Sequence, residues 1–417
     1  MAERVLGRFL RYAAIPTQSK DQAGKVPSTD SQWTLARLLV EELKTVGLKD
    51  ARVDSKCCVY ATLPSNLPPG KAEKIPTIGL ISHLDTSPDV PEGPIKPVIH
   101  RKYAGGDLAL SNDRSRVLTV AENPLLKKQI GADIVTTDGT TLLGADDKAG
   151  IAEIVTALEE LVANPGILHG TIKIAFTPDE EVGGSVDAFD VKGWGARYAY
   201  TVDGEQLGEL SDQTFNASAG TVTFLGKNVH PGDAKGKMVN SLYAACRFVG
   251  ELPRSIRPER VDGFEGYIHA NAITGSEEKT TVKLLLRDFQ RSGIQRKTAL
   301  LERLLKRIQR EFPGTKATLT VTESYRNMHD VLKDVPFVTD FAAEAMRSAG
   351  VTPVFKPVRG GTDGSDITFK GVPTPNLFTG GHNPHSRFEW ISSRDMEKAV
   401  LTLVNLVRIW AEKGAGR

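Results

Sequence analysis

The chain has 417 residues, of which 40% are hydrophobic, enough to build two or three domains with substantial cores. Its 53 basic and 51 acidic residues nearly cancel and form no block of like charge, which argues against nucleic acid and anionic membranes as partners. Three cysteines are too few for a disulfide framework or a four-thiolate zinc site, and such a count is typical of a reducing compartment.

The N-terminal segment 1–16 places Val5, Leu6 and Phe9 on one helical stripe, with charged residues between them. This pattern predicts an amphipathic helix and not a secretion signal, whose apolar region is unbroken. No apolar run in the chain reaches the length that spans a bilayer. We therefore expect a cytoplasmic protein with no membrane partner.

Strand-like and helix-like segments alternate through the first half of the chain. The predicted helices are 31–47 and 147–163, and the predicted strands are 75–86, 171–181 and 196–204. Helix 147–163 has the clearest periodicity, with apolar residues at helical spacing at Ile151, Ile154, Val155, Leu158, Leu161 and Val162. The alternation predicts an α/β layer around a largely buried sheet.

The pattern changes after about residue 215. The predicted strands are then 219–230, 266–276, 280–290 and 317–325, and the predicted helices are 240–252 and 296–312. This order is that of a split βαβ unit of the ferredoxin-like kind, which can fold by itself. Helices 335–350 and 392–414 and strand 375–378 follow it. We therefore predict a catalytic domain from 1–214 and 327–417, interrupted by an inserted domain at 215–326.

Several side chains that can bind metal ions follow the predicted strands. His83 and Asp85 are two residues apart in an extended segment, so both can point to one site. Asp146 and Asp147 lie in the turn before helix 147–163, where the helix dipole favours negative charge. Capping alone would explain one of these two acids.

Further candidates follow other strands of the catalytic domain. Glu180 and Glu181 stand side by side after an apolar strand, Asp203 ends the next strand, and His385 lies in a glycine-broken loop. Open α/β sheets build their sites at these carboxyl ends. Two imidazoles and three carboxylates suit two divalent ions about 3.5 to 4 Å apart, with one carboxylate bridging them.

The adjacent glutamates are expected to have different roles, because neighbouring residues of an extended chain point in opposite directions. We expect Glu181 to bind a metal ion, and Glu180 to take a proton from the bound water as general base. Asp85 is expected to hydrogen-bond the second nitrogen of His83 and fix its tautomer. Taken singly, each acid could instead be a solvated loop residue.

Several motifs resemble those of the dinuclear zinc peptidase family that includes glutamate carboxypeptidase and succinyl-diaminopimelate desuccinylase. They are SHLDT, GADDKAG, TPDEEVGG, VDG and NPHSRFEW, together with NVHPGDAKGKMVNS in the insert. The resemblance covers essentially the whole chain and is greatest to the cytoplasmic aminotripeptidases of that family. It implies a mixed sheet sandwiched by helices as the catalytic domain, with the ferredoxin-like insert as a lid and dimerisation domain.

The resemblance also implies two Zn²⁺ per subunit, for which Co²⁺ or Mn²⁺ could substitute. The implied ligands are His83 and Asp203 for one ion, Glu181 and His385 for the other, and Asp146 as the bridge. The peptide bond after Asp146 is cis in the family. His382 is the rival of His385, and the family register favours His385. Glu180 matches the general base and Asp85 the orienting acid.

Other positions resemble residues that act on the substrate. His230 resembles a histidine that reaches across a dimer to stabilise the oxyanion. Asn240, Arg287 and Arg359 resemble residues that bind polar groups of the substrate, such as a terminal carboxylate. A structural salt bridge is the alternative for Arg287, and a structural role is equally compatible with Arg359.

The resemblance implies a homodimer, formed through the insert, that removes the N-terminal residue from tripeptides. A carboxypeptidase, deacylase or desuccinylase on the same scaffold is the first alternative. A metal-bearing binding or scaffold protein without catalysis is the second, and it predicts a missing base or ligand. Every such position is present in this sequence.

Overall fold

The computed structural model describes all 417 residues, and its contacts divide the chain into two compact units. The first comprises 1–212, 330–356 and 366–417, and the second comprises 213–329 and 357–365. The second unit contains the whole predicted insert, 215–326. It also contains 357–365, which we predicted to lie in the catalytic domain, because Val358 pairs with Thr214 in a β-bridge.

An eight-stranded mixed sheet forms the centre of the first unit. Its strands, in spatial order, are β1 (Arg52–Val53), β2 (Val59–Leu63), β8 (Ile172–Thr177), β3 (Ile78–His83), β9 (Tyr198–Gly204), β16 (Asn376–Phe378), β10 (Glu209–Ser211) and β15 (Val354–Phe355). The neighbouring strands β8, β3, β9 and β16 run parallel to one another. Their carboxyl ends therefore lie along one edge of the sheet.

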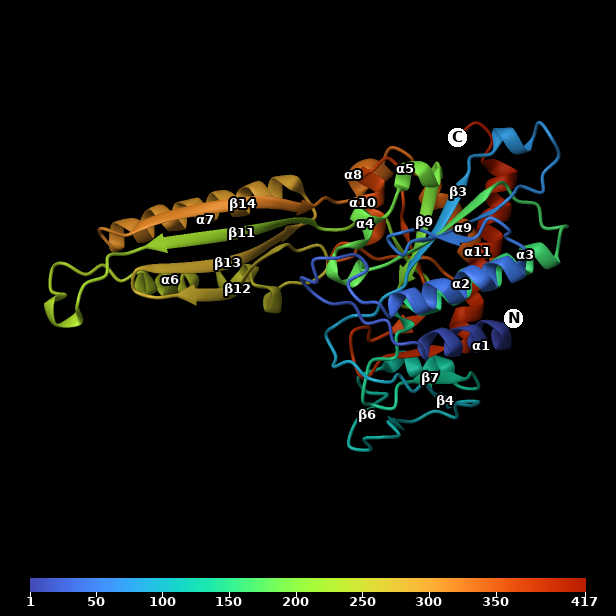
Figure 1. Ribbon diagram of the computed structural model, residues 1–417, viewed down its shortest axis with the longest axis horizontal. Coiled ribbons are helices and arrows are strands. Elements are labelled where there is room, and N and C mark those ends of the chain that lie inside the picture. The colour runs from blue at the N-terminus through green and yellow to red at the C-terminus, as the bar shows by residue number, and fades with distance from the viewer. The chain divides into compact units, whose positions relative to one another are not determined.

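Helices pack against both faces of this sheet (Figure 1). One core contains side chains of α1 (Ala2–Ala13), α2 (Gln32–Val46), α3 (Ala145–Ala163), α9 (Phe337–Ser348) and α11 (Ser393–Lys413), and the other contains side chains of α4 (Ser185–Ala188), α5 (Val191–Trp194) and α10 (Asp363–Phe369). Alternation along the strands separates the cores, since Leu80 lies in the first and Ile81 in the second. At Gly79 a Cβ would lie 1.9 Å from the Trp194 ring, so only glycine fits there. The predicted mixed sheet between helices is confirmed.

Shorter elements complete the first unit. A four-stranded sheet has the order β17 (Gly381–His382), β18 (Trp390–Ser392), β7 (Ile134–Thr136) and β4 (Val98–His100), and a two-stranded ribbon pairs β5 (Leu108–Ala109) with β6 (Val117–Leu118). The 3₁₀ turns of the whole chain are η1 (Ala72–Lys74), η2 (Pro124–Gln129), η3 (Glu180–Val182), η4 (Pro231–Asp233), η5 (Arg254–Ile256) and η6 (Pro258–Arg260), and α8 spans His329–Leu332. No helix has both the length and the apolar character that a membrane span needs.

The second unit is ferredoxin-like, as predicted (Figure 1). Its antiparallel sheet has the order β12 (Tyr267–Gly275), β13 (Lys279–Asp288), β11 (Asn216–Leu225) and β14 (Lys316–Tyr325). The helices α6 (Ser241–Gly250) and α7 (Arg291–Glu311) cover one face. Phe224, Phe248 and Leu301 are among the fully buried residues of their shared core.

Two sequence expectations for the first unit are wrong. Val162, predicted to lie on the apolar stripe of α3, is 42% exposed, while the charged residue Glu153 of the same helix is fully buried. The predicted strand 171–181 ends at Thr177, and Glu180 begins the 3₁₀ turn η3. The turn starts because Asp179 adopts the left-handed conformation, with φ at 59° and ψ at 32°.

The buried carboxyl of Asp395 should make the stability of the fold depend on pH. Burial raises the pKa of this carboxyl in α11 to about 7, and only Gln129 donates a hydrogen bond to it, at 2.6 Å. Because the folded chain then holds the proton more tightly than the unfolded chain, stability should fall as pH rises from about 4 to about 7. Asp395→Asn should raise the free energy of unfolding by on the order of 4 kcal/mol at pH 8, where the buried carboxyl would be ionised, and should change it little at pH 4.

Urea unfolding of the Asp395 variant and of wild type across this pH range checks the prediction. Asp340→Asn is the matched control, because Asp340 is an exposed acid in the first turn of α9. If the free energies of unfolding of wild type and Asp395→Asn changed with pH in the same way, the predicted cost of ionising buried Asp395 would be contradicted.

Candidate active site

The five predicted metal ligands come together at the carboxyl edge of the large sheet. His83 is the last residue of β3, Asp203 belongs to β9, and Glu181 follows β8 in the turn η3. Asp146 lies in the first turn of α3, and His385 follows β17. Because these parallel strands end side by side, the residues that follow them lie close together, as their positions at strand ends predicted.

Asp146 stands between the two histidines. Its Oδ1 lies 2.9 Å from Nε2 of His83, and its Oδ2 lies 3.3 Å from Nε2 of His385. The peptide bond between Asp146 and Asp147 is cis, as the resemblance implies. A carboxylate that turns one oxygen to each side has the arrangement of a bridging ligand.

Each histidine also approaches a second carboxylate. Nε2 of His83 lies 3.6 Å from Oδ1 of Asp203, and Nε2 of His385 lies 2.8 Å from Oε2 of Glu181. His382 makes neither contact and instead stacks on Trp390, with ring centroids 3.8 Å apart. The geometry thus gives two donor sets that share Asp146, and it places His385, not His382, beside the acids.

The electrostatics of the cluster are those of a cation site. Burial, followed by the charge of Asp146, raises the pKa of Glu181 to about 7. Hydrogen bonds with Asp146 and Glu181 raise the pKa of His385 to about 11. Burial acts to raise the pKa of Asp146, but hydrogen bonds with His385 and His83 hold it well below its usual range. A positive charge among these acids would therefore stabilise their ionised forms.

The donors fit divalent metal ions. Ligand atoms of His83, Asp146 and Glu181 lie within 4.8 Å of one another, as do those of His83, Asp147 and Asp203. Oε1 of Glu181 is buried and has no hydrogen-bond partner, so this oxygen is available to a ligand. Imidazole nitrogen and carboxylate oxygen are donors that zinc accepts, which makes this a candidate metal site.

Asp85 orients both the histidine and the glutamate pair. Its carboxylate accepts hydrogen bonds from the backbone N–H groups of Glu180 and Glu181, at 3.0 and 3.2 Å. Nδ1 of His83 lies 3.0 Å from the main-chain oxygen of Asp85 and 3.4 Å from its Oδ1. The main-chain carbonyl of Asp85 is therefore closer to Nδ1 of His83 than the Asp85 carboxylate, which we predicted would fix the imidazole tautomer.

The two glutamates lie in a different local structure from the one on which we based their different roles. They lie in a 3₁₀ turn and not in an extended strand. In such a turn successive side chains are about 120° apart, because three residues complete one turn. Glu180 and Glu181 can therefore still serve different partners, although the argument from strand alternation does not apply.

Two buried acids outside the five predicted ligands hold those residues in place. Oδ2 of Asp147 accepts a hydrogen bond from the backbone N–H of His83, at 3.1 Å. The carboxylate of Glu389, which is 2% exposed, accepts from the N–H groups of Leu143, Gly144 and Asp146, at 2.6, 2.8 and 3.0 Å. The signal for Glu389 in the sequence was its place in the motif NPHSRFEW, just before the apolar strand "WIS".

Glu389→Gln is expected to weaken metal binding. Glutamine has one acceptor oxygen, so its amide NH₂ would face the N–H of Asp146 or those of Leu143 and Gly144. We expect zinc affinity to fall about 10- to 100-fold, the usual cost of losing a partner behind a metal ligand. Competition with a chromogenic chelator measures this, with the exposed Glu122→Gln as control. Wild-type affinity in a folded Glu389→Gln protein would contradict the assignment.

Two predicted substrate residues lie in polar turns of the second unit. His230 is exposed, and its Nδ1 accepts a hydrogen bond from the N–H of Gly232, at 3.1 Å. Asn240 is the N-cap of α6, where its Oδ1 accepts from the N–H of Leu242, at 2.9 Å. Capping explains Asn240 structurally, and its substrate role stays a prediction.

The two arginines contact main-chain carbonyls. Arg287 donates to Ser218 and Leu286, at 3.3 and 3.0 Å, and makes no ion pair, so the alternative of a structural salt bridge is not observed. Arg359 donates to Gly263 and Glu265, at 2.6 and 3.0 Å. These bonds give Arg359 a structural role in the second unit, and carboxylate binding by either arginine stays a prediction.

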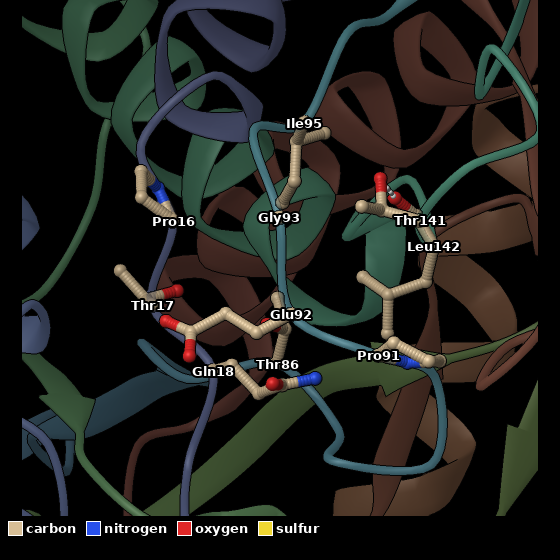
Figure 2. A pocket seen from close by; sticks show the side chains of 10 residues that line it. All are labelled: Pro16, Thr17, Gln18, Thr86, Pro91, Glu92, Gly93, Ile95, Thr141 and Leu142. Atoms are coloured by element: carbon tan, nitrogen blue, oxygen red, sulfur yellow. Dashed lines mark hydrogen bonds between the residues drawn. The ribbon is translucent and has the colours of Figure 1, made fainter.

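Two small cavities lie in the first unit. One, of about 20 Å³, is lined by Asp146, Asp203, Glu205 and His382, so it adjoins the predicted metal ligands. The other, of about 10 Å³, lies between the segment carrying Pro16, Thr17 and Gln18 and the segment carrying Thr141 and Leu142 (Figure 2). The second cavity has space for about one water molecule and contains no predicted ligand, so we assign it no substrate.

The chain is similar to known peptidases over its whole length. The family model "Peptidase family M20/M25/M40" matches residues 137–409. Peptidase T of Desulfitobacterium hafniense is 46% identical over 98% of both chains, and peptidase T of Geobacillus kaustophilus is 43% identical over 100% of both. The crystal structure of the aminopeptidase PepT from Bacillus cereus superposes with a TM-score of 0.76 over 99% of both chains, at 22% identity.

Proposed function

The chain belongs to the peptidase family M20/M25/M40, and we propose from its similarity to peptidase T proteins that it removes the N-terminal residue from tripeptides. It is a hydrolase and a metallopeptidase. Similarity to peptidase T proteins across the full length, and not only across the metal ligands, supports the tripeptide substrate.

One observation carries the proposed chemistry. Asp146 lies between the pair His83 and Asp203 and the pair His385 and Glu181, with histidine contacts of 2.9 and 3.3 Å. We propose that these residues hold two Zn²⁺, for which Co²⁺ or Mn²⁺ could substitute. Bound zinc would polarise the scissile carbonyl and lower the pKa of water toward about 7.

Glu180 is the proposed general base. Its backbone N–H is held by Asp85, while Glu181 in the same turn contacts His385. In this position the Glu180 carboxylate would accept a proton from the attacking water and deliver it to the departing amine. The alternative of a scaffold without catalysis loses support, because no ligand or base position is missing.

The second unit supplies the remaining proposed roles. From the resemblance, His230 would stabilise the oxyanion, and Asn240, Arg287 and Arg359 would bind polar groups of the substrate. We also propose a homodimer formed through this unit. A cytoplasmic location is supported by the three free cysteines.

A hydrolysis panel tests the proposed substrate. Dipeptides, tripeptides and tetrapeptides with unmodified or acetylated amino termini are compared before chelation, after chelation and after zinc return. Activity confined to tripeptides with an unmodified amino terminus is the expected result. A preference for acylated amino acids would favour a deacylase or desuccinylase, and removal of the C-terminal residue would favour a carboxypeptidase. Inactivity on the whole panel with zinc restored would favour the scaffold alternative.

A further inference from the structure

We propose that Ser28 and Gln32 are positioning residues for the general base, acting through the carboxylate of Asp179. This inference rests on the proposed role of Glu180. The segment "VPSTDSQW", which contains both residues, contributes no metal ligand, and the hydrolysis chemistry gives it no task. Its polar side chains nevertheless reach the residue immediately before Glu180.

The three side chains form a buried cluster. The carboxylate of Asp179 accepts hydrogen bonds from the N–H and Oγ of Ser28, at 2.6 and 2.5 Å, and from Nε2 of Gln32, at 2.7 Å. Gln32 returns a bond, since its Oε1 accepts from the N–H of Asp179 at 3.3 Å. Asp179 is 1% exposed and Gln32 is fully buried, so water cannot replace these partners. We call this set the Asp179 clamp.

The clamp holds a conformation that an ordinary residue disfavours. Asp179 has φ at 59°, in the left-handed region, and this reversal ends the path of β8 and starts the turn that carries Glu180. Left-handed residues other than glycine persist where the surroundings hold them, and they gather at functional sites. The four hydrogen bonds to Ser28 and Gln32 are such surroundings.

The glutamate turn is held from two directions. Asp85 accepts from the N–H groups of Glu180 and Glu181, and the clamp fixes the side chain and N–H of Asp179. The turn closes on itself where the carbonyl of Asp179 accepts from the N–H of Gly184, at 2.8 Å. Loss of the clamp should therefore let Glu180 shift, while Glu181 stays with Asp146 and the histidines, because its carboxylate is also held by His385, at 2.8 Å, and would be held by the metal ion.

Asp179→Asn and Ser28→Ala test the clamp in the full-length, zinc-loaded protein. Asparagine tolerates the left-handed conformation, but either amide orientation faces Ser28 N–H or Gln32 Nε2 with another donor. We expect kcat to fall about 10- to 100-fold, as for a displaced catalytic group, with KM and bound zinc within about twofold of wild type. Ser28→Thr keeps the hydroxyl and should retain activity. Ser31→Ala, in the same loop but without contact to Asp179, is the matched control.

Asp179→Gly separates the clamp from the backbone shape, because glycine adopts the turn without the carboxylate. Wild-type kcat in Asp179→Gly or Asp179→Asn would overturn the proposal, as would a loss of activity that is explained by missing zinc.

If the wild-type protein cleaves acylated substrates instead of tripeptides, the proposed function fails, and the clamp variants are then compared on those substrates. If wild type is inactive, amide exchange decides: segment 178–184 should exchange at least about tenfold faster in Ser28→Ala than in Ser31→Ala, and equal rates would overturn the clamp.

Discussion

Replacing Glu180 by glutamine should lower kcat for tripeptide hydrolysis by about 10²- to 10⁴-fold, the usual contribution of a general base. The amide is nearly the same size as the carboxylate but cannot accept a proton at neutral pH. KM and the zinc content should remain close to wild type, because the proposed ligand in this turn is Glu181, whose Oε2 lies 2.8 Å from His385. Steady-state kinetics and elemental analysis of the purified variant measure both quantities.

The neighbouring residue provides the control. Glu181→Gln should lose zinc from the half of the site that contains His385, whereas Glu180→Gln should lose none. The two variants change the same functional group one residue apart, in the same 3₁₀ turn, so a general disturbance of the turn would affect both alike. A normal kcat in Glu180→Gln would remove this residue from the base role.

Replacing Asp146 by alanine should abolish binding of both metal ions. Its two carboxylate oxygens face different histidines, at 2.9 and 3.3 Å, so one substitution removes a ligand from each donor set. The loss of zinc affinity should exceed the roughly 10- to 100-fold effect of removing a partner behind a ligand. Activity should fall with it, and elemental analysis after dialysis gives the direct readout.

Asp203→Ala is the comparison for the bridge. Asp203 lies 3.6 Å from Nε2 of His83, in the His83 half of the proposed site, so its loss should affect one ion and leave the His385 half able to bind. Equal zinc content in wild type and Asp146→Ala would show that this carboxylate does not bridge.

Much of the architecture could be predicted from local sequence patterns. Apolar residues at helical spacing in α3, and short apolar runs at β3 and β8, indicate that these whole elements are buried. Periodicity in the sequence predicts this kind of burial well. The chemistry-bearing residues stand just past those runs, so the position of His83 and Asp203 at strand ends already indicated a shared edge. The ferredoxin-like order of the second unit followed from the same alternation.

The parts that could not be predicted depend on partners distant in sequence. Nothing local shows that Glu389 accepts hydrogen bonds from the loop before Asp146, or that Ser28 contacts Asp179. The left-handed conformation of Asp179 turned an expected strand end into a 3₁₀ turn. Segment 357–365 belongs to the second unit, where Val358 pairs with Thr214, and the strand and helix patterns of the sequence do not indicate this pairing.

An anomalous difference map from crystals of the zinc-loaded protein, collected at the zinc absorption edge, tests the central claim most directly. Two peaks about 3.5 to 4 Å apart are expected on either side of Asp146, one beside His83 and Asp203 and the other beside His385 and Glu181. A single peak, or peaks that Asp146 does not join, would contradict the dinuclear centre on which the proposed hydrolysis depends.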